Sequence, residues 1–307
     1  MRTAFINQLI DEARKNSKVF LIVGDLGFSV VEPFVEEFPQ QFLNIGIAEQ
    51  NMAGVAAGLS MEGYCVYIYS IGNFPTLRCI EQIRYDICYH NLNVKIIAVG
   101  GGYAYGSLGP SHHATEEIGM LRTIPNLTIC APGDPIEASE VTKLSANTFG
   151  PFYIRLGKAG EPVVHESNIE LSIGNCLPII SGKRNAVFTM GATLKYAKDF
   201  VINNSLNASV YSFPFIKPLN KLNLLEIFLR YENIITIEEH QSSAGFGSAI
   251  LEVLNDLQEE DLIQLNQIPR IRRVAIPNKF YSIAGTQNYL RNAAGIKLEK
   301  YFFNIKK

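Results

Sequence analysis

The chain alternates short, uniformly apolar runs with segments whose apolar residues recur at helical spacing. In the first half, the runs predict strands at residues 19–23, 42–45, 64–69, 94–99, 127–130 and 151–155. The segments between them predict helices, including one that begins at Glu49 and one with apolar residues at positions 77, 80, 83 and 87. Uniformly apolar strands separated by helices are typical of a parallel sheet covered on both faces.

The second half repeats this alternation after a break. Residues 157–182 are rich in glycine and proline and show little periodicity, which is typical of a connection between domains. Further strands are expected at 186–189, 208–211, 234–237 and 273–276, with a helix at 243–257. The sequence therefore predicts two α/β domains, residues 1–165 and 175–307, each a mostly parallel sheet flanked by helices.

Composition narrows the class of protein. Only 18% of the residues are charged, which favours a subunit that buries surface in an oligomer. The net charge of −2 argues against a nucleic-acid partner, and no apolar run approaches the roughly 20 residues of a membrane span. The first 18 residues lack a signal-peptide pattern, and the five cysteines contain no Cys-x-x-Cys pair. We expect a cytoplasmic protein with reduced cysteines.

Four loops follow predicted strands of the first domain and carry residues that packing does not require: 24–29, 46–49, 70–74 and 100–113. Ligands of open α/β sheets bind beyond the carboxyl ends of strands, so these loops predict a site. Glu49 stands where a strand meets a helix of small residues, and it is either a simple first-turn carboxylate or a functional group. His112 and His113 are adjacent and cannot share a helix face, so we predict no metal ligands here. The pair is either a polar cap or a source of an imidazole directed at substrate.

Several motifs together resemble one enzyme class. They are Gly46-Ile-Ala-Glu-Gln50, Arg78-Cys-Ile-Glu-Gln-Ile-Arg84, Gly109-Pro-Ser-His-His113, Leu121-Arg-Thr-Ile-Pro-Asn126, Ile216-Lys-Pro-Leu219 and Glu238-Glu-His-Gln241. The chain resembles the pyrimidine-binding and C-terminal domains of transketolases and deoxyxylulose-phosphate synthases over essentially its whole length. This resemblance implies thiamine diphosphate as cofactor and two-carbon ketol transfer between sugars as the reaction.

The resemblance also implies roles for single residues at the cofactor. Glu49 matches the glutamate that bonds the aminopyrimidine ring, and Phe74 matches an aromatic that stacks on it. Gln50 and Ile71 are further expected neighbours of the cofactor, although many family members have an aromatic residue where Ile71 stands. His112 matches a catalytic histidine beside the substrate.

A second set of residues is expected at the substrate. His112 and His113 come from the histidine loop, and Arg155, Arg2 and Ser29 match ligands of a sugar phosphate. Guanidinium groups suit phosphate because they donate two parallel hydrogen bonds.

Leu108 departs from the family pattern. It replaces an acidic residue that reads a hydroxyl of the donor, so we expect an unusual sugar, with or without a phosphate.

The diphosphate-binding motif of the class, Gly-Asp-Gly followed by Asn, is not found; the near match Gly24-Asp-Leu-Gly27 falls in the pyrimidine domain. We therefore expect the C-terminal subunit of a split transketolase. Its N-terminal partner subunit is expected to bind Mg²⁺ and the diphosphate, and this chain is expected to homodimerise within a heterotetramer. The alternatives are the beta subunit of a 2-oxo acid dehydrogenase, a decarboxylating enzyme like deoxyxylulose-phosphate synthase, and a non-catalytic subunit of the same fold.

Overall fold

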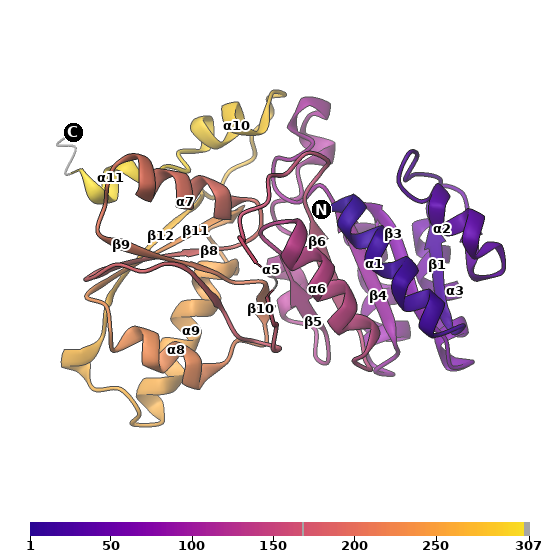
Figure 1. Cartoon of the computed structure of the whole chain (residues 1–307), viewed down its shortest axis with the longest axis horizontal. Coiled ribbons are helices and arrows are strands. Elements are labelled where there is room, and N and C mark those ends of the chain that lie inside the picture. Colours follow the sequence, from indigo (N-terminus) through magenta and orange to yellow (C-terminus); the bar gives the residue numbers. More distant parts are fainter. Residues whose placement is uncertain (168, 304–307) are drawn as a thin grey trace.

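Two sheets organise the chain, one in each domain (Figure 1). The structure is a computed structural model and describes residues 1–167 and 169–303. The first sheet has seven strands in the order β10-β5-β6-β4-β3-β1-β2, and the second has five in the order β12-β11-β8-β9-β7. The pairing is parallel except where β10 joins β5 and β7 joins β9. The predicted fold class, two α/β domains with mostly parallel sheets, is confirmed.

The first sheet lies between two layers of helices. Its strands are Val19–Val23 (β1), Phe42–Asn44 (β2), Cys65–Ile71 (β3), Val94–Val99 (β4), Thr128–Cys130 (β5), Phe152–Leu156 (β6) and Phe215–Lys217 (β10). Helices Arg2–Lys15 (α1), Glu32–Glu37 (α2) and Pro135–Ala146 (α6) pack on one face. Helix Glu49–Met61 (α3), the helical segment 77–88 and helix Glu117–Arg122 (α5) pack on the other. This arrangement brings the loops after β1, β2, β3 and β4 to one edge.

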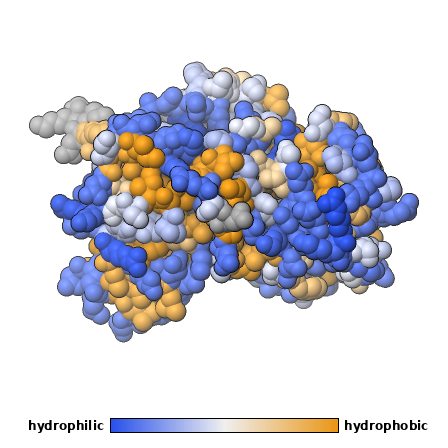
Figure 2. Space-filling view, viewed as in Figure 1, coloured by the Kyte–Doolittle hydropathy of each residue, from blue (hydrophilic) through white to orange (hydrophobic). Residues whose placement is uncertain are grey.

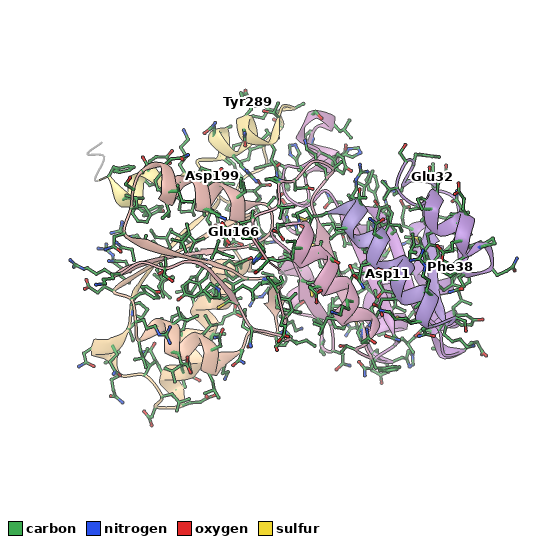
Figure 3. All side chains as sticks on the ribbon, viewed as in Figure 1. Asp11, Glu32, Phe38, Glu166, Asp199 and Tyr289 are labelled. Atoms are coloured by element: carbon green, nitrogen blue, oxygen red, sulfur yellow. The ribbon has the colours of Figure 1, made fainter. Side chains whose placement is uncertain are left out.

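The second sheet is sandwiched in the same way. Its strands are Leu177–Ile180 (β7), Asn185–Thr189 (β8), Ala208–Ser212 (β9), Asn233–Gln241 (β11) and Arg270–Ile276 (β12). Helices Thr193–Asn203 (α7), Gln287–Ala294 (α10) and Glu299–Phe302 (α11) lie on one side, and Lys221–Phe228 (α8) and Phe246–Glu259 (α9) on the other (Figure 1). Figure 3 marks the outer surfaces of α1, α7 and α10 by Asp11, Asp199 and Tyr289.

Strand β10 crosses the predicted domain boundary. Residues 215–217 follow β9 of the second domain, yet the strand pairs antiparallel with β5 and completes the first sheet. Lys217 strengthens this junction, because its ammonium donates to the carbonyl of Arg122 at 2.9 Å. The two domains therefore share a sheet edge and a continuous apolar core that includes residues of both.

The surface of the molecule is described by its hydropathy and by the burial of its cysteines. The face in Figure 2 is mostly hydrophilic, with separate hydrophobic patches over both domains. The five cysteines are buried and unpaired in the described structure. Among the described residues, no helix is both long enough and apolar enough to cross a bilayer.

Candidate active site at the carboxyl edge of the first sheet

Glu49 is the first residue of α3, and its carboxylate is buried at the carboxyl edge of the sheet. The loop from Gly46 to Ala48 carries the chain from β2 into this helix, and Glu49 is only 4% exposed. A Cβ placed on Gly24, just after β1, would lie 3.8 Å from Cγ of Glu49 and 3.7 Å from Oγ of Ser70. The loops after β1 and β2 and the end of β3 therefore meet around one carboxylate. The hydroxyl of Ser70 is buried there and has no hydrogen-bond partner within the described chain.

A chain of contacts leads from this carboxylate through Arg78 to Phe74 and on to His112. Nη1 of Arg78 donates to Oε2 of Glu49 at 3.2 Å, and the Arg78 guanidinium carbon lies 4.4 Å from the centre of the Phe74 ring. The His112 ring meets the Phe74 ring edge-on at 5.3 Å between centroids, and its Nδ1 is 3.0 Å from Oγ of Ser111. The structure thus brings together three residues that were predicted to share a site, from the loops after β2, β3 and β4.

His113 points to a different environment from His112. It is buried, its ring meets Tyr103 edge-on at 5.1 Å, and its carbonyl accepts a hydrogen bond from Asn73 at 2.7 Å. Burial lowers the pKa of His113, which favours a neutral ring. A cavity of about 220 Å³ between the domains is lined by His113, Asn73 and Tyr103, and by Gln241 and Tyr281 from the second domain.

Arg155 is tied into the interior of the chain. It lies in β6, is 5% exposed, and its Nε is 2.8 Å from Oε1 of Glu117. Its Nη2 donates to the carbonyls of Ala114 and, at 3.0 Å, Glu239. Gly101 lies so close that a Cβ there would stand 2.2 Å from Nε of Arg155. In this structure the guanidinium of Arg155 joins the domains. Its role as a ligand of a sugar phosphate stays a prediction, and binding of the phosphate would require the guanidinium to give up some of these contacts.

The other predicted substrate ligands are Arg2, Ser29 and Leu108. They lie at the same edge of the first sheet, but each has different neighbours. Arg2 is half-buried at the start of α1. Its charge lies near Tyr69, where it partly offsets the rise that burial causes in the pKa of Tyr69. Ser29 is exposed at φ 62°, and its N–H donates to Oε1 of Glu32 at 2.8 Å. Leu108 is 56% exposed in the 3-10 turn Gly106–Leu108. Their substrate roles stay predictions.

Two expected cofactor neighbours, Ile71 and Gln50, flank the central residues. Ile71 is the last residue of β3 and is half-buried, three residues before Phe74. Gln50 follows Glu49 in the first turn of α3 and is exposed. Their contact with a cofactor also stays a prediction.

Sequence reasoning missed Arg78 as a site residue. Its signal was available, because Arg78 follows Phe74 by four residues and residues at that spacing share a face when the segment is helical.

A second cluster, formed by Asp134, Glu137 and His165, is explained by bonds within the chain. One oxygen or nitrogen of each lies within 4.8 Å of the others. Asp134 accepts from the N–H groups of Glu137 and Val164, both at 2.8 Å, and His165 Nε2 is 2.8 Å from Oε1 of Glu137. These bonds fasten the interdomain connection to the N-terminus of α6.

Comparison with known families identifies both halves of the chain. Residues 1–160 match the model of the transketolase pyrimidine binding domain, and residues 174–290 match that of the transketolase C-terminal domain. The chain belongs to the transketolase family. The resemblance to transketolases that the sequence suggested is thereby confirmed.

Similar proteins fall into two length groups. The chain is 31% identical to an apulose-4-phosphate transketolase subunit of Actinobacillus succinogenes, over 87% of this chain and 84% of the relative. It is also 31% identical to the putative transketolase C-terminal section of Methanocaldococcus jannaschii, over 83% and 81%. The match to the 1-deoxy-D-xylulose-5-phosphate synthase 1 of Geobacter sulfurreducens is 32% identical but spans only 45% of that protein.

A solved structure agrees with the first group. It is a split-gene transketolase, an inactive β4 tetramer, that superposes with a TM-score of 0.82 at 31% identity and covers 96% of this chain and 93% of that one. A transketolase of Pichia stipitis superposes at 0.78 with 16% identity and supports the fold alone. The chain is thus similar in length to split transketolase subunits.

Proposed function

We propose that this chain is the C-terminal subunit of a two-component transketolase that transfers a two-carbon ketol unit with thiamine diphosphate. The observation that carries the proposal is the buried carboxylate of Glu49, which Arg78 links to the Phe74 ring, with His112 packed on the edge of that ring. A merely structural first-turn glutamate does not require burial, a guanidinium partner and an aromatic–imidazole pair linked to that partner. The arrangement suits a flat, nitrogen-containing ring that needs one carboxylate partner.

The residues present fit the aminopyrimidine end of the cofactor. Glu49 would bond a ring nitrogen, Phe74 would cover one face, and the unpartnered hydroxyl of Ser70 offers a further polar contact. The bound cofactor would supply a carbanion that attacks a carbonyl and an electron sink for the resulting charge. Glu49 would control the protonation of the ring. His112 would donate a hydrogen bond to a substrate oxygen or transfer a proton to or from it.

A partner subunit is part of the proposal. It would provide the sites for the diphosphate and Mg²⁺, because the Gly-Asp-Gly and Asn motif that forms these sites in the family is not found in this sequence. Apolar side chains stand exposed around the Glu49 edge, with Phe28 and Ile47 75% and 76% exposed, as expected of a surface that another subunit covers. The similarity to a split-gene transketolase supports the same division, and we propose a heterotetramer in which this chain dimerises.

The donor sugar is proposed to differ from that of ordinary transketolases. Leu108 offers no acceptor at the position where the resemblance expects a carboxylate, and it faces solvent at the site's edge. Two relatives are named for apulose 4-phosphate, which makes this sugar phosphate the first donor to test.

A decarboxylating condensation is the second candidate, because the chain is 30–34% identical to several deoxyxylulose-phosphate synthases. A 2-oxo acid dehydrogenase subunit and a non-catalytic subunit are the competing hypotheses that the same assays address. The assembled complex should be offered ketose phosphates and a 2-oxo acid in parallel. Release of CO₂ from the 2-oxo acid without ketol transfer would replace our proposal by the decarboxylating one.

The substitution Glu49→Gln directly tests the proposed role of the Glu49 carboxylate at the cofactor ring. In the complex with its partner subunit, the variant should lose about 10²–10⁴-fold in turnover while the fold is kept, because an amide cannot hold the ring proton as a carboxylate does. The measurement is deuterium exchange at the reactive carbon of bound thiamine diphosphate. Glu62→Gln, at the exposed glutamate that follows the far end of α3, is the matched control and should leave exchange almost unchanged. An unchanged exchange rate in Glu49→Gln contradicts the assignment.

A further inference from the structure

Arg78 contacts both groups that the proposed function assigns to the cofactor ring. Its Nη1 is 3.2 Å from Oε2 of Glu49, and its guanidinium carbon is 4.4 Å from the centre of the Phe74 ring. The two partners differ in burial, since the Arg78 side chain is 52% exposed and that of Glu49 is 4% exposed. The arginine therefore approaches from the open side of the site and covers a carboxylate that water barely reaches.

The chemistry of a guanidinium explains this position. It is planar and cationic, so it stacks on an aromatic face and donates to a carboxylate at the same time. A buried carboxylate without a partner is strongly unfavourable, so Glu49 needs such a donor whenever no other is present. An aminopyrimidine ring has the same two properties, a flat face and polar hydrogens at its edge. The guanidinium and the ring compete for the same surfaces.

We propose that Arg78 is an internal competitor of the aminopyrimidine ring of thiamine diphosphate. This inference rests on the proposed function. Arg78 holds Glu49 and Phe74 in the free subunit and turns away when the cofactor binds in the assembled enzyme. Its exposed, flexible stem permits the movement, and Glu81, three residues further along the helical segment, offers an alternative carboxylate on the same face.

Competition lowers the apparent affinity for the cofactor. A ligand that binds only one of two arrangements has its affinity reduced by the fraction in which that arrangement is populated. The ion pair has one half-exposed partner, and such an ion pair and an exposed cation–π contact each contribute little, so the reduction should be modest, about three- to tenfold. It should also slow binding, because the arginine must leave first.

Arg78→Met tests the competition, with Arg84→Met as its control. Methionine keeps the stem but neither pairs with Glu49 nor carries charge. Arg84 lies in the same segment and is also exposed, and it stands 4.3 Å over the Tyr85 ring instead of the site. Thiamine diphosphate with Mg²⁺ is titrated into the assembled complexes by calorimetry. We expect Arg78→Met to bind about three- to tenfold tighter than wild type and Arg84→Met to bind as wild type does.

A second measurement uses the unaltered chain. The Nε–H resonance of Arg78 is followed by NMR while the free subunit is titrated with 4-amino-2,5-dimethylpyrimidine, the ring fragment of the cofactor. The resonance should shift in step with saturation, as the guanidinium leaves the Phe74 face.

The outcomes separate the two hypotheses. If the wild-type complex binds no thiamine diphosphate, the proposed function fails. If wild type binds it and Arg78→Met binds equally or more weakly, Arg78 is a support of the site and the competition is overturned. If Arg78→Met does not fold, an Arg78 resonance that stays fixed at saturation overturns the competition on the wild-type chain alone.

Discussion

Buried charged residues in this molecule are stabilised by specific hydrogen-bond and ion-pair partners. Glu49 is tolerated in the interior because Arg78 reaches it, and Arg155 is tolerated in β6 because Glu117 and two carbonyls surround it. Burial raises the pKa of Glu117, and the Arg155 charge partly offsets this rise. The two arginines differ in exposure: Arg78 is half-exposed and can turn into solvent once another donor takes its place at Glu49, whereas Arg155 is itself buried beside Glu117, and its removal would leave that carboxylate unpaired.

Leu108 is the residue at which donor choice can be tested. An apolar side chain leaves a sugar hydroxyl without an acceptor, which costs about 1–3 kcal/mol, or roughly 5- to 150-fold in kcat/KM. The wild-type complex should therefore use xylulose 5-phosphate and fructose 6-phosphate poorly. Leu108→Asp should raise kcat/KM for them within that range. The measurement is a competition between those donors and apulose 4-phosphate.

The neighbouring turn residue supplies the control for Leu108. Ser107 is exposed in the same turn, so Ser107→Asp adds the same charge without replacing the apolar side chain. It should leave donor preference as in wild type. A wild-type complex that strongly prefers xylulose 5-phosphate, together with an aspartate variant that gains nothing, would show that Leu108 does not select the donor.

At the scale of elements, the apolar runs predicted the parallel strands, including the edge strands β2 and β12, and missed the two antiparallel ones. The run 94–99 corresponds to β4 because every residue in it is buried, including Lys95, whose ammonium donates to the carbonyls of Thr148 and Gly150. Strands β7 and β10 were missed because they are short, antiparallel and at sheet edges, where no uniform apolar run is needed. Their pairing is decided by contacts distant in sequence.

The helical segment 77–88 shows another limit of periodicity. One long helix was expected, but the segment contains a 3-10 turn at Leu77–Cys79, an α turn at Ile80–Gln82 and a π turn at Ile83–Cys88. Apolar spacing indicates which face is buried, and it indicates less well how tightly the backbone is wound. The site showed the same pattern, since Glu49, Phe74 and His112 could be predicted from motifs, whereas the position of Arg78 depends on how this segment is wound.

The loop after β4 depends on glycine at Gly102, which can be tested. Gly102 has φ 64°, and a Cβ there would lie 2.2 Å from Oε2 of Glu239. That carboxylate accepts from the N–H of Tyr103 at 3.0 Å and pairs with Arg291, so it cannot simply move away. Gly102→Ala should destabilise the chain by about 2–4 kcal/mol, from backbone strain plus overlap. Denaturant unfolding of the free subunit measures this change.

Gly295→Ala separates strain from overlap. Gly295 ends α10 with a similar φ of 72°, but a Cβ there would meet nothing within 4 Å. Its substitution should cost only about 1–2 kcal/mol. Equal losses in the two variants would mean that contact with Glu239 contributes little.

At the scale of the whole molecule, the end of β11 joins the two domains through Glu239 and His240, while the preceding Glu238 fixes the strand to α9 of its own domain. Glu238 accepts from the N–H groups of Phe246 and Gly247 at the start of α9, at 2.6 and 2.8 Å. Glu239 reaches the loop after β4, and His240 Nε2 accepts from the N–H of Gly119 at 3.0 Å. The candidate site and the second domain are thus held in register by one strand end.

His240 should make the stability of the subunit fall in acid. Burial, together with the nearby Arg155 charge, lowers its pKa from 6.5 to about 4, so the ring stays neutral in the folded chain. Between pH 6.5 and 4 the unfolded chain binds a proton there that the folded chain does not, so the free energy of unfolding decreases as pH falls. From about pH 8 to about pH 5 this contribution amounts to about 2 kcal/mol. Glu238 acts in the opposite direction, because burial raises its pKa to about 7.

Comparison of variants isolates the His240 contribution from that of Glu238. His240→Gln keeps an acceptor for Gly119 but does not titrate, so its free energy of unfolding should fall about 2 kcal/mol less than wild type between about pH 8 and about pH 5. His90→Gln, at an exposed histidine, should follow the wild-type curve. If His240→Gln also follows that curve, then the folded chain binds a proton at His240 as readily as the unfolded chain does, and the neutral ring at the domain junction is wrong. A smaller acid loss in His240→Gln alone would identify the strand end of β11 as the acid-sensitive link between the domains.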